Sequence, residues 1–134
     1  MRTIKFRAMR NNGKWVIGNY VHHFISYFDT IERHSIFLSK SENDNGGHWV
    51  EDIITKTIGQ FTGLYDKDGK EIYEGDILDF NGLTVEVRFV RGAFAFLVNG
   101  YLDDELYGDC RTDLFAKVIG NVYENPELLK GGKK

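Results

Sequence analysis

Residues Asp66 to Phe89 read DKDGKEIYEGDILDFNGLTVEVRF, and the turn signals in this stretch decide the fold. Asn81-Gly82 is a strong two-residue hairpin signal, because both central positions of a type I′ turn need a positive φ. After this turn, Val85 and Val87 alternate with polar residues, which is the period of a strand with one buried face. Gly69 is expected in the left-handed position of a short hairpin loop. The stretch therefore predicts short antiparallel strands joined by tight turns.

The same pattern continues toward the C-terminus. Arg91-Gly92 turns the chain into an apolar strand over residues 93–98, and a last strand is expected over residues 117–123. Short strands so closely spaced by turns suit a small β-barrel whose curvature is set by glycines. We therefore expect a C-terminal lobe over residues 59–129, followed by a disordered tail over residues 130–134.

The residues before Gly59 predict a second β-rich lobe, over residues 1–58. Two strands, 4–8 and 14–24, flank an Asn-Asn-Gly turn, and Gly18 inside the second strand suggests a bulge. Only a short strand is expected in the next segment, over residues 36–38. The mainly β character thus extends over both lobes.

The end of the N-terminal lobe alternates between polar and apolar segments. Residues 40–48 are rich in Ser, Asn, Asp and Gly and predict a variable, exposed loop. The residues after the loop are expected to rejoin the core: Trp49, Val50, Ile53 and Ile54.

The composition narrows the possible functions. The chain has 134 residues, which suits one domain or two small lobes, and its formal net charge of -3 gives no global field for attracting nucleic acid or anionic lipid. Cys110 is the one cysteine, so no intramolecular disulfide is expected. The N-terminus lacks a signal-peptide apolar region, and residues 93–98 are far short of the roughly 20 apolar residues that span a bilayer. We expect a cytoplasmic protein without membrane insertion.

Four separate segments together resemble one family. They are IKFRA at residues 4–8, TIGQFTGL at 57–64, DKDGKEIYEGDI at 66–77 and VIGNVYENPELL at 118–129. In order and spacing they resemble the YopX-like family of phage and prophage proteins. The resemblance implies a mostly β fold with an SH3-like barrel in the C-terminal half, in a protein of the host bacterial cell. It implies no activity, and it transfers no catalytic or binding residues to this chain.

The central motif, from Thr57 to Ile77, is interpreted as a structural joint between the lobes. Ile72 and Ile77 have the spacing of core positions. Glycine recurs often enough in this motif to fit a chain that reverses direction repeatedly at positive φ, at Gly59, Gly63, Gly69 and Gly75.

Metal-ligating residues occur without a recognisable spaced motif. His22 and His23 are adjacent on a predicted strand, so their side chains point to opposite faces and cannot easily share one ion. One of them could pair with His34, His48 or Cys110 in a zinc site. Residues 41–52 imitate the spacing of a calcium loop poorly, since the first position is Ser and the last carboxylate is Asp. We therefore expect no metal and no cofactor.

No catalytic constellation is predicted either. Cys110 is a lone thiol of the kind that usually packs as a small apolar residue, and the consecutive acidic residues 103–105 have the pattern of a solvated turn. We therefore expect a protein that is not an enzyme. The enzyme hypothesis, the least supported of those considered, would be revived if two or more of these residues met in a pocket with carboxylates: His22, His23, His34, His48 and Cys110.

Two binding functions are compatible with these observations. The first is a non-catalytic accessory protein that binds a host or phage protein, or itself, because the aromatic content of 14% leaves rings for an interface. The alternative is a nucleic-acid-binding barrel with a local basic strip made of Lys5, Arg7, Arg88 and Arg91. The acidic total charge favours the first, because such cations also serve to solubilise strand edges.

Overall fold

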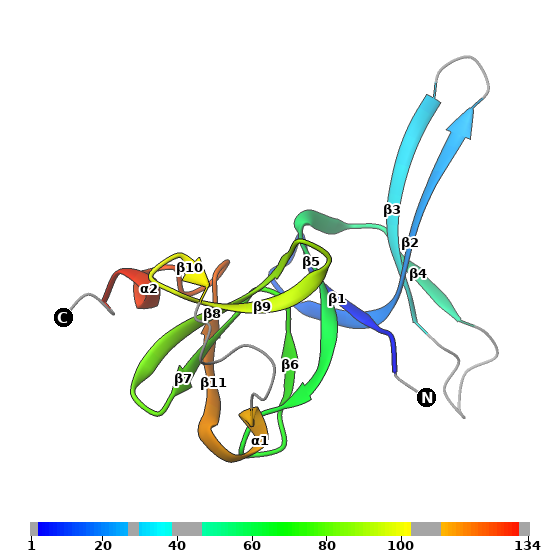
Figure 1. Ribbon diagram of the computed structural model, residues 1–134. Coiled ribbons are helices and arrows are strands. Elements are labelled where there is room, and N and C mark those ends of the chain that lie inside the picture. Colours follow the sequence, from blue (N-terminus) through cyan, green and yellow to red (C-terminus); the bar gives the residue numbers. More distant parts are fainter. Residues whose placement is uncertain (1–2, 27–29, 39–46, 103–110, 132–134) are drawn as a thin grey trace. The chain divides into compact units, whose positions relative to one another are not determined.

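The computed structural model describes residues 3–26, 30–38, 47–102 and 111–131 (Figure 1). The protein is mainly β, as the sequence predicts, with two sheets and two short helices among the described residues. The chain divides into two compact units, residues 1–60 and 61–134. Strand β5 (Ile53–Tyr65) belongs to both, because its first half pairs with β1 (Phe6–Arg10) and its second half with β6 (Glu71–Tyr73).

Unit 1 is an antiparallel sheet in the order β4-β3-β2-β1-β5. Its further strands are β2 (Trp15–Ser26), β3 (Thr30–Leu38) and β4 (His48–Val50). One face of the sheet forms the core, whose buried members are Ala8, Val16, Ile36, Val50 and Ile53. The burial of Val50 and Ile53 confirms their predicted place in this core.

Trp49 lies outside this core, so its predicted burial is wrong. Its side chain is 55% exposed. The register pairs Trp49 with Phe37, next to the Ile36–Val50 pair that faces the core. Because successive side chains of a strand alternate between faces, Trp49 and Phe37 share the opposite face of the sheet.

Two glycines of unit 1 play roles other than those expected. No register shift is seen at Gly18; a Cβ there would lie 2.9 Å from Cγ2 of Ile36, so glycine permits a close approach between β2 and β3. Gly59 has no positive φ. It pairs with Arg7 beside the β1–β5 register shift, where the Thr57 hydroxyl accepts a 2.8 Å hydrogen bond from the Met9 amide.

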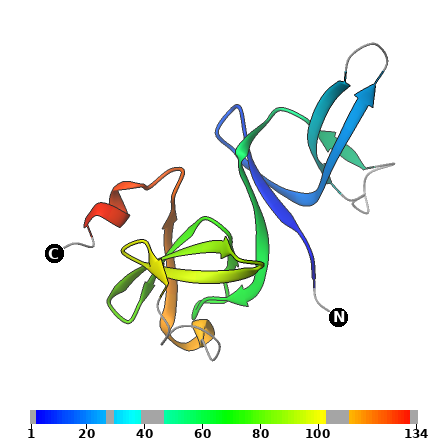
Figure 2. The same cartoon turned by 45° about the horizontal axis from the view of Figure 1, so that its top comes forward.

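The hairpin of β2 and β3 extends past its neighbours. In the described part of the chain, β2 pairs with β1 only from Trp15 to Gly18, and β3 pairs with β4 only from Ile36 to Leu38. We call the remaining residues of the two strands, 19–26 and 30–35, the arm. Figure 1 and Figure 2 both show the arm as a two-stranded ribbon. The short strand predicted over residues 36–38 is therefore too short, since β3 begins at Thr30.

Unit 2 contains an antiparallel sheet in the order β10-β9-β8-β7-β11. Its core combines Ile72, Leu78, Phe80, Val85, Val87, Phe96 and Ala116. Its further elements are β7 (Asp76–Phe80), β8 (Leu83–Val90), β9 (Ala93–Val98), β10 (Tyr101–Leu102), α1 (Thr112–Phe115), β11 (Ala116–Asn121) and α2 (Glu127–Gly131). The SH3-like barrel stays a prediction.

The turns of unit 2 follow the predicted chemistry. Asn81 and Gly82 have φ values of 52° and 91°, which confirms the double positive φ of a type I′ hairpin. Gly69, at φ 82°, takes the predicted left-handed position. Ile72 and Ile77 are fully buried, as core positions should be. None of the described helices is long and apolar enough to cross a membrane.

Asp66 ties the loop between β5 and β6 to β11. Its buried carboxylate accepts hydrogen bonds from three backbone amides: those of Asp68 and Lys70 at 2.9 Å and that of Val118 at 3.0 Å. Burial by itself would raise the pKa of Asp66, but these amide donors outweigh it and hold the pKa below its ordinary value.

Candidate functional site on the arm

The two faces of the arm differ because side chains alternate along each strand. His22 on β2 lies directly opposite His34 on β3, and Phe24 lies opposite Glu32. These four side chains therefore share one face of the ribbon. His23, opposite Arg33, lies on the other face.

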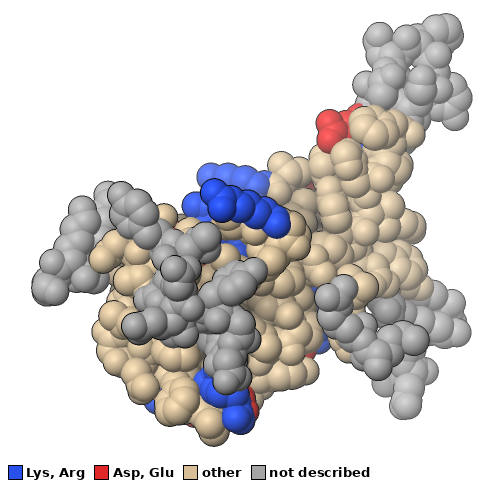
Figure 3. Space-filling model, in the orientation of Figure 1, with Lys and Arg blue, Asp and Glu red and all other residues tan. Residues whose placement is uncertain are grey.

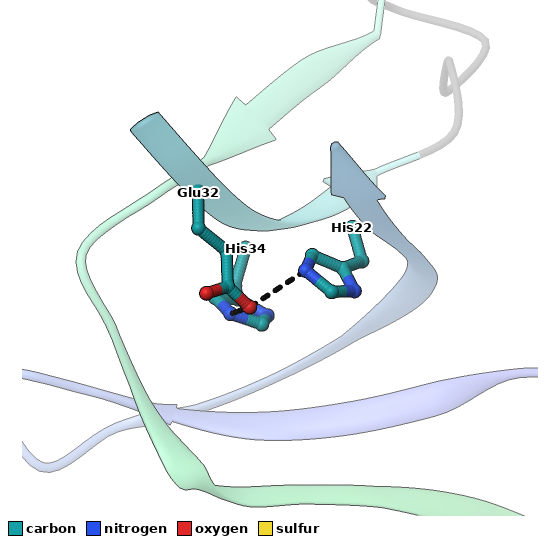
Figure 4. Close-up of side chains that lie close together, drawn as sticks. All are labelled: His22, Glu32 and His34. Carbon is teal, nitrogen blue, oxygen red and sulfur yellow. Dashed lines mark hydrogen bonds and ion pairs between the residues drawn. The ribbon is translucent and has the colours of Figure 1, made fainter. Parts of the chain in front are cut away.

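Three polar groups meet on the first face. One oxygen of Glu32, Oε1, lies 2.7 Å from Nε2 of His22 and 3.0 Å from Nε2 of His34 (Figure 4). The two imidazole rings stack, with centroids 4.4 Å apart and planes 14° from parallel. The three potential ligand atoms all lie within 4.8 Å of one another. We call His22, Glu32 and His34 the His-Glu-His cluster.

Tyr20 extends the cluster toward the core. Its hydroxyl lies 2.6 Å from Nδ1 of His34, the ring nitrogen that faces away from Glu32. Burial and the charge of Glu32 both raise the pKa of Tyr20, so its phenol keeps its proton at neutral pH. A neutral His34 that donates from Nε2 to Glu32 therefore accepts a hydrogen bond from the Tyr20 hydroxyl at Nδ1.

The cluster has the chemistry of a metal site. Imidazole nitrogens and carboxylate oxygens are ordinary ligands of zinc and related divalent transition metals. The side chains of His22 and Glu32 are 38% and 52% exposed, so an ion can reach them from solvent. His22 and His34 are among the several zinc partners predicted from the sequence, and the structure brings these two together. Glu32 was not among the predicted ligands, although it follows the i, i+2 spacing of one strand face.

The opposite face carries an open depression lined by Val21, His23, Trp49 and Glu51, with a volume of about 350 Å³. Ser35 is fully buried on this face, opposite Val21, and its hydroxyl has no hydrogen-bond partner in the described part of the structure. The Trp49 ring packs against Phe37, with centroids 4.9 Å apart. The depression thus combines an exposed aromatic wall with a few polar groups.

The predicted basic strip is divided between the two units. In unit 1, the Arg7 guanidinium lies 4.6 Å from the centroid of the Trp15 ring. In unit 2, Nε of Arg88 lies 3.6 Å from a carboxylate oxygen of Glu86, and Arg91 is exposed in the β8–β9 turn. Lys5 lies just before β1. The strip stays a prediction.

The other candidates either lie outside the described residues or, where described, lie away from the cluster. Cys110, the acidic residues 103–105 and residues 41–46 of the calcium-like pattern lie outside the described residues. The last carboxylate of that pattern, Asp52, accepts a 3.1 Å hydrogen bond from Nε of Arg10. This hydrogen bond lowers the pKa of Asp52. His23 lies on the other face of the arm, and His48 is exposed on β4.

One of the comparisons with known proteins identifies a family. The sequence model of the YopX protein family matches residues 5–130. None of the curated proteins compared matches this sequence. Among solved structures, protein EF1440 from Enterococcus faecalis is 26% identical, with a TM-score of 0.58 over 96% of this chain and 99% of that one. The chain belongs to the YopX protein family.

Proposed function

We propose that this chain is a phage- or prophage-encoded accessory protein that acts in the bacterial cytoplasm by binding another protein, without catalysis. The observation that carries the proposal is the depression beside Trp49 on unit 1. Trp is the residue type most enriched among the side chains that dominate protein interfaces. Here Trp49 is more than half exposed among the described residues, with its ring packed against that of Phe37.

The surroundings of Trp49 suit a protein partner. Val21 and Trp49 supply apolar walls, while Glu51 and His23 supply polar groups at the rim. Interfaces combine an apolar centre with a polar rim in this way. On the face drawn in Figure 3, uncharged residues cover most of the described surface of unit 1, which also favours a protein over a highly charged ligand.

Nucleic acid is the less favoured partner. Glu51 would repel a phosphate backbone at the depression, and the nearby cation, Arg33, already pairs with it at 3.5 Å. Two arginines of the predicted strip have described partners: Arg7 lies against Trp15, and Arg88 lies against Glu86. The basic strip of Lys5, Arg7, Arg88 and Arg91 therefore remains the alternative.

Substitution of Trp49 tests the proposal. We expect the Trp49→Ala variant to bind its partner at least about 30-fold more weakly, because a central interface Trp contributes about 2 kcal/mol or more. Phe89→Ala is the matched control, since Phe89 is an aromatic residue of unit 2 with 50% exposure. Proteins that bind to the wild type and to Phe89→Ala but not to Trp49→Ala are purified. Titration calorimetry then measures their affinities for the wild type and for each of the two variants.

Self-association is measured on the same proteins by sedimentation velocity. A wild-type oligomer that Trp49→Ala dissociates would identify a second copy of the chain as the partner. Unfolding curves must show that both variants are folded. Equal affinities of the wild type and Trp49→Ala for every captured protein would contradict the proposal.

A further inference from the structure

We propose that His22, Glu32 and His34 form a binding site for one divalent transition-metal ion of the zinc type. The ion links the two strands of the arm. The site lies on the face of the sheet opposite the Trp49 depression. The inference does not depend on a protein partner. It also revises the expectation from the sequence that the chain holds no metal.

The spacing of the ligand atoms suits such an ion. Zinc lies about 2.0 to 2.1 Å from imidazole nitrogen, and tetrahedral geometry then places neighbouring ligand atoms roughly 3.3 Å apart. The two nitrogens now lie 2.7 and 3.0 Å from the shared oxygen of Glu32. Binding of one ion also requires the stacked imidazole rings, whose planes lie 14° from parallel, to turn so that both Nε2 atoms face the ion.

Tyr20 is placed to orient one ligand. Histidines that bind metals almost always hold their second ring nitrogen in a hydrogen bond. When Nε2 of His34 gives its lone pair to the ion, the proton moves to Nδ1, which then donates to the Tyr20 hydroxyl at 2.6 Å. The Tyr20 hydroxyl is thus hydrogen-bonded to Nδ1 of His34 both with and without the ion. Tyr20 acts here as a positioning residue.

The position of the cluster gives the ion a structural role. A two-stranded ribbon by itself is marginally stable in water, and among the described strands residues 21–26 of the arm pair only with residues 30–35 of the same ribbon. The cluster takes one ligand from β2 and two from β3, so a bound ion joins the strands beyond the core of unit 1. The free energy of metal binding then stabilises the folded form of the arm.

The described residues supply three ligands, which leaves one position of a tetrahedral ion open. The exposure of His22 and Glu32 makes that position accessible to water. In zinc sites with three protein ligands, most of which are catalytic, water commonly holds the fourth position.

Zinc binding by the full-length chain without a histidine tag tests the inference. Titration against a chromophoric chelator should show one tight zinc ion per chain. We expect His22→Ala and Glu32→Gln each to weaken binding at least about 10-fold, and Tyr20→Phe to weaken it by about 10-fold, the lower range for an outer-shell partner. The matched controls His23→Ala and His48→Ala should stay within about twofold of wild type.

A cobalt titration gives a second readout, because tetrahedral cobalt absorbs visible light far more strongly than the hydrated ion. Circular dichroism without metal establishes that each variant is folded. If His34→Ala fails to fold, the half-exposed His22 and Glu32 still carry the test. Absence of saturable zinc binding in the wild type, or equal affinity in His22→Ala and His23→Ala, would overturn the inference. Because no partner is present, neither outcome bears on the proposed protein binding.

Discussion

Replacing Asp66 with Ala is expected to lower the free energy of unfolding by about 3 kcal/mol or more, because hydrogen bonds to a charged group contribute about 1.5 to 3 kcal/mol each. The buried carboxylate accepts from three backbone amides in the β5–β6 loop and in β11, and Ala leaves all three donors without it. Asp68→Ala is the control in the same loop, where the side chain is exposed, and it should cost at most about 0.5 kcal/mol. Urea unfolding followed by circular dichroism measures both.

The same residue sets a pH dependence. The pKa of Asp66 is lower in the folded protein than the ordinary value of about 3.9. Asp66 therefore contributes its full stabilisation above the unfolded pKa, and this contribution is lost as the pH falls through the folded pKa. The stability difference between wild type and Asp66→Asn should thus shrink below about pH 4. A difference that is unchanged down to pH 2, or equal losses in Asp66→Ala and Asp68→Ala, would contradict this role.

Gly75→Val should be the most damaging of the turn substitutions, at about 3 kcal/mol, because a β-branched side chain is disfavoured at positive φ and its Cβ would crowd the Tyr123 ring. Gly75 has a φ of 95°, and a Cβ there would lie 3.0 Å from Cε2 of Tyr123. Its amide also donates to the Val87 carbonyl at 2.8 Å, and its carbonyl accepts from Val122 at 2.9 Å, so the backbone cannot shift freely.

Gly69→Val is the matched comparison. Gly69 has a similar φ of 82° but no atom within 4 Å of the position of a Cβ. Only the backbone strain of about 1 to 2 kcal/mol applies there. Denaturant unfolding of the two variants separates strain from crowding. If Gly69→Val lowers the free energy of unfolding as much as Gly75→Val does, the Tyr123 contact contributes nothing.

Local turn chemistry explains which parts of the fold could be predicted. Asn81-Gly82 and Gly69 adopt positive φ because the residues themselves favour it, wherever the strands pack. The face taken by Trp49 depends instead on its pairing with Phe37, about a dozen residues away. A large apolar residue such as Trp is expected to be buried, but the register places Trp49 on the exposed face of the sheet.

The candidate site was only partly predictable for the same reason. Residues 30–35, TIERHS, have few apolar positions, and they form a strand because β2 pairs with them. The sequence names His22 and His34 as possible partners without distinguishing them from His48 or Cys110. The cross-strand register sets His22 opposite His34, and no local pattern encodes it, whereas Glu32 shares the face of His34 through their i, i+2 spacing.

Photo-crosslinking in cells that carry the gene tests most directly whether the Trp49 face of unit 1 binds a protein. A benzophenone amino acid replaces Trp49 in one strain and Phe89 in another, and ultraviolet light is applied to both. We expect a discrete, heavier covalent product from position 49 and none from position 89. Products from position 89 alone, or no product from position 49 in folded, expressed protein, would contradict it.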